Sequence, residues 1–168
     1  MRRALALFIG IAALASSLLA VQKAHAEAAD YVLIEKQQRK LTLFKNKEPI
    51  KSYRIALGAN PTGKKEREGD GKTPEGKYTI DYHKPDSHFH RALHIAYPNR
   101  QDLENAEKKG IKQPGSLIMI HGLGKNFGWL GKLHRKWDWT SGCIAVTNEE
   151  IEEIYAAVPD GTPVEIAP

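Results

Sequence analysis

The chain has 168 residues, with 25 basic side chains, 20 acidic side chains, a formal net charge of +5 and one cysteine. This length suits a single domain with one core, and one cysteine excludes an intrachain disulfide framework. Three of the five net positive charges lie in the first 26 residues. Without Arg2, Arg3 and Lys23, the chain keeps 22 of its 25 basic residues against 20 acidic ones, a net charge of +2. The composition therefore gives no case for nucleic-acid binding.

Residues 1–26 have the pattern of a secretory signal peptide. Met1-Arg2-Arg3 is a basic start, residues 4–21 are mainly apolar, and Ala24-His25-Ala26 fits the small-x-small cleavage pattern. We therefore expect export to the periplasm, cleavage after about Ala26, and a mature domain of residues 27–168. The alternative is an uncleaved anchor, because the apolar stretch approaches the length of a bilayer span. No later segment is apolar enough to span, so we expect no stable membrane insertion after cleavage.

The mature part begins with strand patterns. Residues 31–34, 40–44 and 52–57 are short runs rich in β-branched or aromatic side chains, separated by polar, turn-prone stretches. They predict a meander of antiparallel strands. Residues 58–76 contain five glycines and two prolines among charged residues, which predicts a long loop. Further strands are expected at residues 77–82, 116–120 and 163–166.

Two short helices are expected in the second half of the chain. Residues 101–109 have the composition of an exposed helix and are followed by Gly110. Thr147 and Glu150 form a capping-box pattern. The apolar face that follows has Ile151, Ile154, Tyr155 and Val158 at helical spacing, and Pro159-Asp160-Gly161 ends it. The predicted fold class is a mainly β domain with about two short helices.

Cys143 is the most informative single residue. In an exported protein, an unpaired cysteine is either buried as a small apolar side chain or kept for its reactivity. Thr140-Ser141-Gly142 precedes it, and we expect a helix to begin just after it, so that backbone N–H groups stabilise a thiolate.

His121 is the natural partner of this thiol. It follows an apolar strand and precedes Gly122, which favours an imidazole that faces a cleft. Together, the two residues suit nucleophilic catalysis, in which the histidine removes the thiol proton and the thiolate attacks a carbonyl. Amides of Ser141, Gly142 and Cys143 would hold the oxyanion. The residues alone leave open a buried structural cysteine and a histidine satisfied in the core.

These residues resemble the signature of the L,D-transpeptidase (YkuD-type) catalytic domain. The signature is carried by His121-Gly122, by Thr140-Ser141-Gly142-Cys143-Ile144 and by Asn148. Residues 71–78, 93–99 and 115–122 resemble further conserved stretches of that family, so the resemblance covers roughly residues 31–166. It implies an L,D-transpeptidase-type β-sandwich or barrel of mixed strands.

The resemblance also implies an activity. In this family, a cysteine attacks the diaminopimelate carbonyl of a peptidoglycan tetrapeptide stem and releases D-alanine. The acyl group then passes to an amine on another stem or on an anchored lipoprotein. Transferred by position, Cys143 is the nucleophile, His121 is the base, and Gly122 orients the imidazole through its carbonyl. The Ser141, Gly142 and Cys143 amides form the oxyanion hole, and no metal or other cofactor is required.

Two positions depart from the family pattern. Ser141 stands where the family commonly has histidine, and Ala145 where it often has an arginine that could bind a carboxylate. The motif Asp-Trp-Thr-x-Gly-Cys-Ile-Ala-Val-Thr-Asn at residues 138–148 resembles a subgroup that includes a hydrolase releasing peptidoglycan-anchored lipoprotein. The alternatives are therefore such a hydrolase, or an L,D-carboxypeptidase, and a non-catalytic peptidoglycan-binding domain with Cys143 buried.

Other polar and aromatic residues have less specific patterns. Tyr97, His94, Trp139 and Asn148 are candidate substrate-binding residues, although aromatic residues on strands are as often part of the core. His88, His90 and His94 could suggest a metal site, but no fourth ligand stands at a telling spacing, so we expect none.

Overall fold

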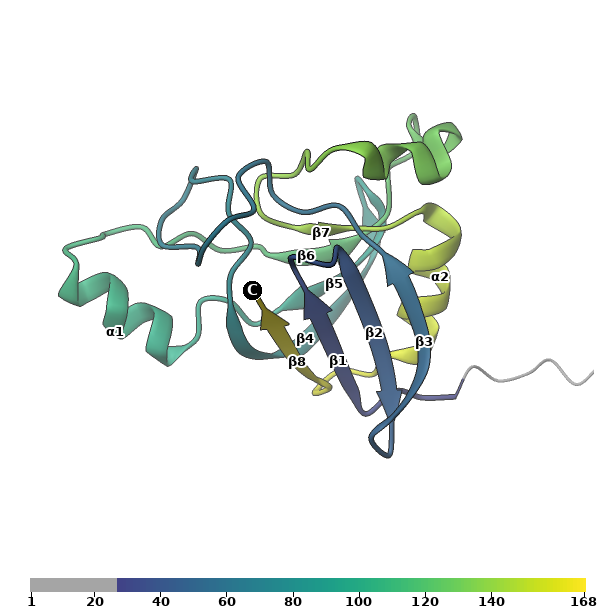
Figure 1. The fold of residues 1–168 in the computed structure, drawn as a ribbon, viewed down its shortest axis with the longest axis horizontal. Coiled ribbons are helices and arrows are strands. Elements are labelled where there is room, and N and C mark those ends of the chain that lie inside the picture. The colour runs from purple at the N-terminus through teal and green to yellow at the C-terminus, as the bar shows by residue number, and fades with distance from the viewer. Residues whose placement is uncertain (1–26) are drawn as a thin grey trace, which may run out of the picture.

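The computed structural model describes residues 27–168, and the predicted leader at residues 1–26 lies outside the described part. The elements, in chain order, are β1 (Tyr31–Glu35), β2 (Lys40–Lys45), β3 (Glu48–Arg54), β4 (Gly76–Ser87), β5 (His90–Ile95), α1 (Arg100–Lys108), β6 (Met119–His121), the 3₁₀ helix η1 (Gly128–Lys136), β7 (Ile144–Ala145), α2 (Asn148–Ala157) and β8 (Pro163–Ala167) (Figure 1). None of these helices is long and apolar enough to cross a membrane.

The strands form one mixed sheet with the order β3-β2-β1-β8-β4-β5-β6-β7. The first three strands are the predicted antiparallel meander, and β8 adds to β1 in parallel. β4 has 12 residues: its first part pairs with β8 and the remainder with β5, so it links the two halves of the sheet. A bridge between Ala56 and Ala145 joins the chain after β3 to the last strand, β7. The expected sandwich or barrel of mixed strands is therefore confirmed.

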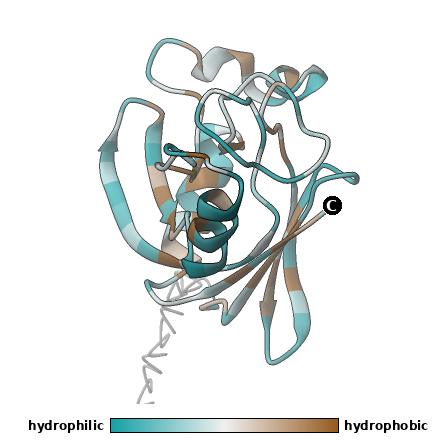
Figure 2. Cartoon of the chain, turned by 90° about the vertical axis from the view of Figure 1, so that its left-hand side faces the viewer, coloured by the Kyte–Doolittle hydropathy of each residue, from teal (hydrophilic) through white to brown (hydrophobic). Residues whose placement is uncertain are grey.

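Apolar side chains fill the space between the two halves of the sheet and beneath α2. Hydrophobic and hydrophilic residues alternate along the strands (Figure 2). On β1, Val32 and Ile34 are fully buried and alternate with half-buried neighbours, as expected for a strand with one face in the core. On α2, Ile151 and Ile154 are fully buried. The predicted capping box of Thr147 and Glu150 is present at its N-terminus. By contrast, α1 is mainly hydrophilic.

Three local predictions are wrong. The third strand ends at Arg54, because Ala56 forms a bridge with Ala145 of β7 and Leu57 bonds Asp138 and Thr140 instead of β2. Only residues 119 and 120 of the predicted strand 116–120 lie in β6, which extends to His121. No helix begins just after Cys143: the buried apolar residues Ile144 and Ala145 pair with β6, and α2 begins only at Asn148. In addition, the glycine-rich segment before Cys143 contains η1, which the sequence did not predict.

Candidate active site

Pairing between β6 and β7 brings His121 and Cys143 to the same face of the sheet. Ile120 lies opposite Ile144, and His121 lies opposite Ala145. Cys143 is two residues before Ala145, and side chains two residues apart along a strand point to the same face. Cys143 directly precedes β7, so the two residues, 22 positions apart in sequence, are brought within a few residues of each other across this strand pair.

His121 is buried as a neutral imidazole with one defined tautomer. Its side chain is 3% exposed, and Nδ1 lies 2.7 Å from the carbonyl oxygen of Gly122. Because a carbonyl only accepts hydrogen bonds, Nδ1 carries the proton and Nε2 is left as the acceptor. Burial lowers the pKa of His121 to about 4, although the hydrogen bond to Gly122 opposes this shift. At neutral pH, Nε2 is therefore free to take a proton.

Gly122 and Asn148 fix the chain directly after the histidine. A Cβ atom on Gly122 would lie 2.6 Å from Asn148 Oδ1 and 3.0 Å from the Phe89 carbonyl oxygen, so only glycine fits. Asn148 Oδ1 accepts a hydrogen bond from the Leu123 N–H at 2.8 Å. Asn148 therefore lies behind the loop that supplies the Gly122 carbonyl, which favours a positioning role over contact with substrate.

Aromatic rings enclose the imidazole. The Phe89 ring centroid is 4.4 Å from that of His121, and the Trp139 centroid is 5.9 Å away in an edge-on arrangement. On its other side, Trp139 contacts His134 and donates from Nε1 to His134 Nδ1 at 3.4 Å. These rings keep water away from His121, which is the physical cause of its lowered pKa.

The Cys143 thiol is half-buried. Sγ lies 3.5 Å from the Leu117 carbonyl oxygen, which it contacts as a weak donor. Burial raises the pKa of Cys143, and the Met119 N–H and the Lys65 ammonium oppose this effect only in part. The expected stabilisation of a thiolate by a helix N-terminus is therefore absent, and the resting sulfur is a thiol that needs a base.

A tight turn precedes Cys143. Thr140 Oγ1 donates to the Cys143 carbonyl at 2.8 Å and accepts from the Gly142 N–H at 3.1 Å. Gly142 has a φ of +135°, and a Cβ atom there would lie 2.5 Å from the Lys72 carbonyl oxygen. The Gly142 amide is thus already bonded within the turn, whereas Ser141 is exposed at its tip.

Asp138 anchors this turn to the sheet. One carboxylate oxygen accepts from the Leu57 N–H at 2.9 Å, and the other lies 2.8 Å from Arg39 Nη2. The Thr140 N–H also donates to the Leu57 carbonyl at 3.1 Å. Sequence reasoning gave no role to Asp138, Arg39 or Thr140, because their partners come from distant segments. Asp138 and Thr140 stand beside the cysteine in the motif, which was their only signal, and nothing in the sequence singled out Arg39.

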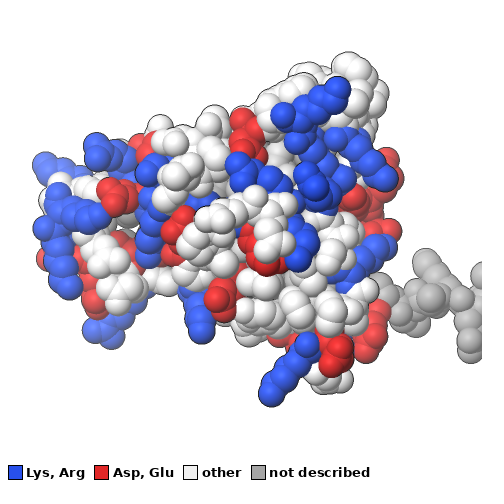
Figure 3. Space-filling model, viewed as in Figure 1, with Lys and Arg blue, Asp and Glu red and all other residues white. Residues whose placement is uncertain are grey.

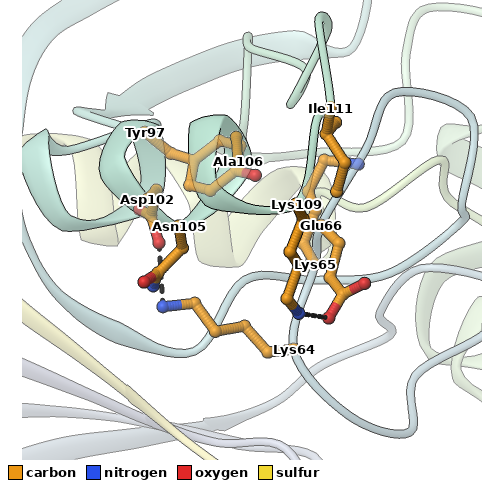
Figure 4. Close-up of a pocket in the computed structure, with 9 residues that line it drawn as sticks. All are labelled: Lys64, Lys65, Glu66, Tyr97, Asp102, Asn105, Ala106, Lys109 and Ile111. Atoms are coloured by element: carbon orange, nitrogen blue, oxygen red, sulfur yellow. Dashed lines mark hydrogen bonds and ion pairs between the residues drawn. The ribbon is translucent and has the colours of Figure 1, made fainter.

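The remaining candidate residues lie in two places. His94 faces Met119 across β5 and β6, on the same face as His121, where it stacks on Tyr82 and bonds Asp81 at 2.6 Å. Tyr97 instead lines a cavity of about 220 Å³ beside α1, and its hydroxyl donates to the Pro114 carbonyl at 3.0 Å (Figure 4). A role for either in substrate binding stays a prediction.

Ion pairs line the cavity beside α1 and explain its polarity. Lys64 lies 2.8 Å from Asp102, and Lys109 pairs with Glu66 (Figure 4). These pairs connect the loop at residues 58–75 to α1. Because each charge faces a partner, we assign this cavity a structural role. Within residues 27–168, no three histidine, cysteine or acidic side chains are grouped so as to hold a metal ion.

A model of the L,D-transpeptidase catalytic domain (YkuD) matches residues 29–166. The chain belongs to this family. It is 31% identical over 162 residues to YafK of Escherichia coli K12, which is named provisionally as an L,D-transpeptidase; the match covers 90% of this chain and 57% of that protein.

Two solved structures have a similar fold. The helical cell shape determining protein Pgp2 from Campylobacter jejuni has a TM-score of 0.63 at 25% identity, covering 83% of this chain and 48% of that one. Bd1075 from Bdellovibrio bacteriovorus has a TM-score of 0.55 at 25% identity, covering 86% and 49%. The chain thus spans about half the length of these relatives.

The two departures from the family pattern occupy different environments. Ala145 is fully buried opposite His121, and its N–H and carbonyl both bond Ala56, at 2.8 and 2.9 Å. An arginine would not fit there without rearrangement. Ser141 is exposed at the tip of the turn. Position 145 therefore carries no charge and has no room for a long side chain in the present packing.

Proposed function

We propose that this domain is a cysteine acyltransferase acting on peptidoglycan stem peptides. The observation that carries the proposal is His121: its Nδ1 is held by the Gly122 carbonyl, its Nε2 is free, and it shares a sheet face with Cys143. Family membership adds the substrate class, since L,D-transpeptidases act on these stems.

The proposed first step is formation of a thioester. Nε2 of His121 takes the Sγ proton while the thiolate of Cys143 attacks the diaminopimelate carbonyl carbon. The Ser141 and Cys143 amides stabilise the oxyanion, because the Gly142 N–H already donates to Thr140 Oγ1. As the intermediate collapses, the C–N bond to the terminal D-alanine breaks, and His121 returns its proton to the leaving amine.

In the proposed second step, an amine from another stem or from a lipoprotein attacks the thioester. His121 takes a proton from that amine and delivers it to the departing sulfur, which restores the resting pair. Because the imidazole is neutral and the thiol protonated at rest, transfer accompanies the attack and no preformed ion pair is needed. We propose the periplasm as the location, with residues 1–26 as the export signal.

The second candidate is a hydrolase that passes the same thioester to water. Ala145 favours it, because a site without the family arginine has one cation fewer to hold a stem carboxylate. Release of anchored lipoprotein or of D-alanine would be the outcome. A non-catalytic peptidoglycan-binding domain would need an inert Cys143.

Mass spectrometry of reaction products separates these candidates. The protein is incubated with a disaccharide tetrapeptide, alone and with a second muropeptide, and separately with lipoprotein-linked sacculi. Dimers joined through two diaminopimelate residues support the transferase. Release of lipoprotein or of D-alanine without dimers supports the hydrolase. Turnover by the Cys143→Ala variant would contradict both enzyme assignments, whereas no turnover by the unaltered protein would favour the binding domain.

A further inference from the structure

Residues 125–137, which we term the aromatic-basic segment, expose large apolar side chains that the proposed chemistry does not use. Trp129 is 77% exposed, Phe127 57%, Trp137 55% and Leu133 51%. They are half of the large hydrophobic residues that are exposed in the described part of the chain, and all four lie within 11 consecutive positions. Such a concentration marks an interaction surface.

The charge of this segment has one sign. Lys125, Lys132, Arg135 and Lys136 are its ionised residues, and the sequence has no aspartate or glutamate between Glu107 and Asp138. Arg135 pairs with Glu150 of α2. The three lysines are exposed and form no ion pair within residues 27–168.

The segment projects from the domain on a preformed support. In Figure 1, η1 lies at the upper right, above β7 and α2, and Figure 3 shows an uncharged cap at the same place with lysine and arginine side chains beside it. Gly131, with a φ of +45°, divides η1 into two short turns. His134 is 2% exposed and Arg135 is bonded to α2, so these two side chains fix the segment from beneath. Its apolar side chains are therefore held outward.

We propose that the aromatic-basic segment binds the surface of an anionic phospholipid bilayer. Trp and Phe side chains favour the headgroup region, Leu133 adds aliphatic area, and the lysines attract anionic headgroups. A stem peptide or glycan strand fits less well. The segment has no carboxylate to accept hydrogen bonds from sugar hydroxyls or amines, whereas its three exposed lysines suit anionic headgroups.

Binding in this way would also orient the active site. Trp137 and Phe127, which lie on the segment, line a cavity of about 230 Å³ together with Phe89 and Trp139. Those last two rings contact His121. The site would then face the bilayer surface. The proposal stands independently of the reaction proposed above, because it concerns side chains that the reaction does not require.

The test uses residues 27–168, which contain the whole sheet and its core, so that the apolar leader cannot itself bind lipid. Sedimentation and tryptophan fluorescence are measured with vesicles of phosphatidylcholine, and of phosphatidylcholine and phosphatidylglycerol in equal parts. We expect binding to the anionic vesicles, a blue shift of the emission, and weakening by salt.

Variants assign the binding to the segment. Lys132→Glu and Lys136→Glu should each lower partitioning at least about fivefold, equivalent to about 1 kcal/mol per basic residue removed. Trp129→Ser with Leu133→Ser should lower it further, by at least tenfold. The matched control is Leu103→Ser with Lys112→Glu, because Leu103 is as exposed as Leu133 but lies on α1. This control should bind like the unaltered domain.

Three results would overturn the proposal. They are equal binding to neutral and anionic vesicles, unchanged binding by the segment variants, and absence of vesicle binding together with segment-dependent binding to purified sacculi. The last result would assign the same surface to peptidoglycan. Circular dichroism of each variant checks that a loss of vesicle binding does not result from unfolding.

Discussion

Protonation of His121 should destabilise the fold in mild acid. The imidazole is 3% exposed, and burial lowers its pKa to about 4, against an ordinary value of 6.5. Between these two values the unfolded chain binds a proton that the folded chain does not. The stabilisation from this residue is therefore complete above about pH 6.5, falls as the pH decreases, and is lost below about pH 4.

The size of the effect follows from the shift. One pKa unit corresponds to about 1.4 kcal/mol, so the full shift is worth about 3 kcal/mol. At about pH 5 the unfolded state is mostly protonated and the folded state mostly neutral, so about 2 kcal/mol should be lost relative to about pH 7.5. Burial and the neighbouring Arg135 guanidinium also lower the pKa of His134 to about 4, so its protonation should add a further loss of stability.

Urea denaturation of residues 27–168 at several pH values tests this. His121→Asn keeps a donor for the Gly122 carbonyl but cannot titrate, so its stability should fall less steeply with acid than that of the unaltered domain, by about 2 kcal/mol at about pH 5. The two proteins are compared by how their free energy of unfolding changes with pH, because the substitution also changes the stability at neutral pH. His134→Asn is the matched control and should remove only the loss of stability in acid that comes from His134. Equal slopes for the unaltered domain and His121→Asn would refute the neutral, buried imidazole.

Three further predictions concern the turn around the nucleophile. Cys143→Ala should abolish thioester formation while changing the free energy of unfolding by less than about 1 kcal/mol, measured by intact-protein mass and urea denaturation; a persisting adduct would contradict the thiol mechanism. Asp138→Ala removes the carboxylate partner of the Leu57 N–H and of the Arg39 guanidinium, so it should lower the free energy of unfolding by about 1–3 kcal/mol and lower kcat. Asp138→Asn should restore part of the stability. Full activity in Asp138→Ala would contradict a positioning role. Ala145→Arg should lower the free energy of unfolding by about 3 kcal/mol or more, because position 145 is fully buried. It should not lower KM for stem peptides. A lower KM in steady-state kinetics would show that the arginine reaches substrate.

The sequence predicted what depends on local pattern. The meander of β1 to β3, the capping box of α2 and the apolar face of Ile151 and Ile154 follow from periodicity and capping, which act over a few residues. Cys143 and His121 were found because each follows a recognisable local context. The residues already suggested that the two act as a pair, and the resemblance to the L,D-transpeptidase family then favoured that interpretation over a buried cysteine and a core histidine.

The sequence could not predict what depends on contacts between distant segments. Asp138 reaches Arg39, which is 99 positions away, and the bridge from Ala56 to Ala145 ends the third strand early. The error at Cys143 has the same origin. A helix start was expected from neighbouring residues, but pairing of Ile144 with Ile120 makes that segment a strand. The pKa of the thiol is accordingly set by burial rather than by a helix dipole.

Because burial, and not a helix dipole, sets the pKa of Cys143, the proposed nucleophile is activated differently from the sequence-based expectation. Thiolates are the form that oxidants and disulfides attack, so a cysteine with a lowered pKa would be vulnerable in an oxidising compartment. Burial raises the pKa of Cys143 and lowers that of His121, which keeps both groups neutral until a carbonyl is positioned for attack. Alkylation by iodoacetamide should therefore be slow at neutral pH and increase above the ordinary pKa of a thiol. Rapid alkylation at neutral pH would mean that a thiolate already exists at rest, and the concerted transfer proposed here would then be wrong.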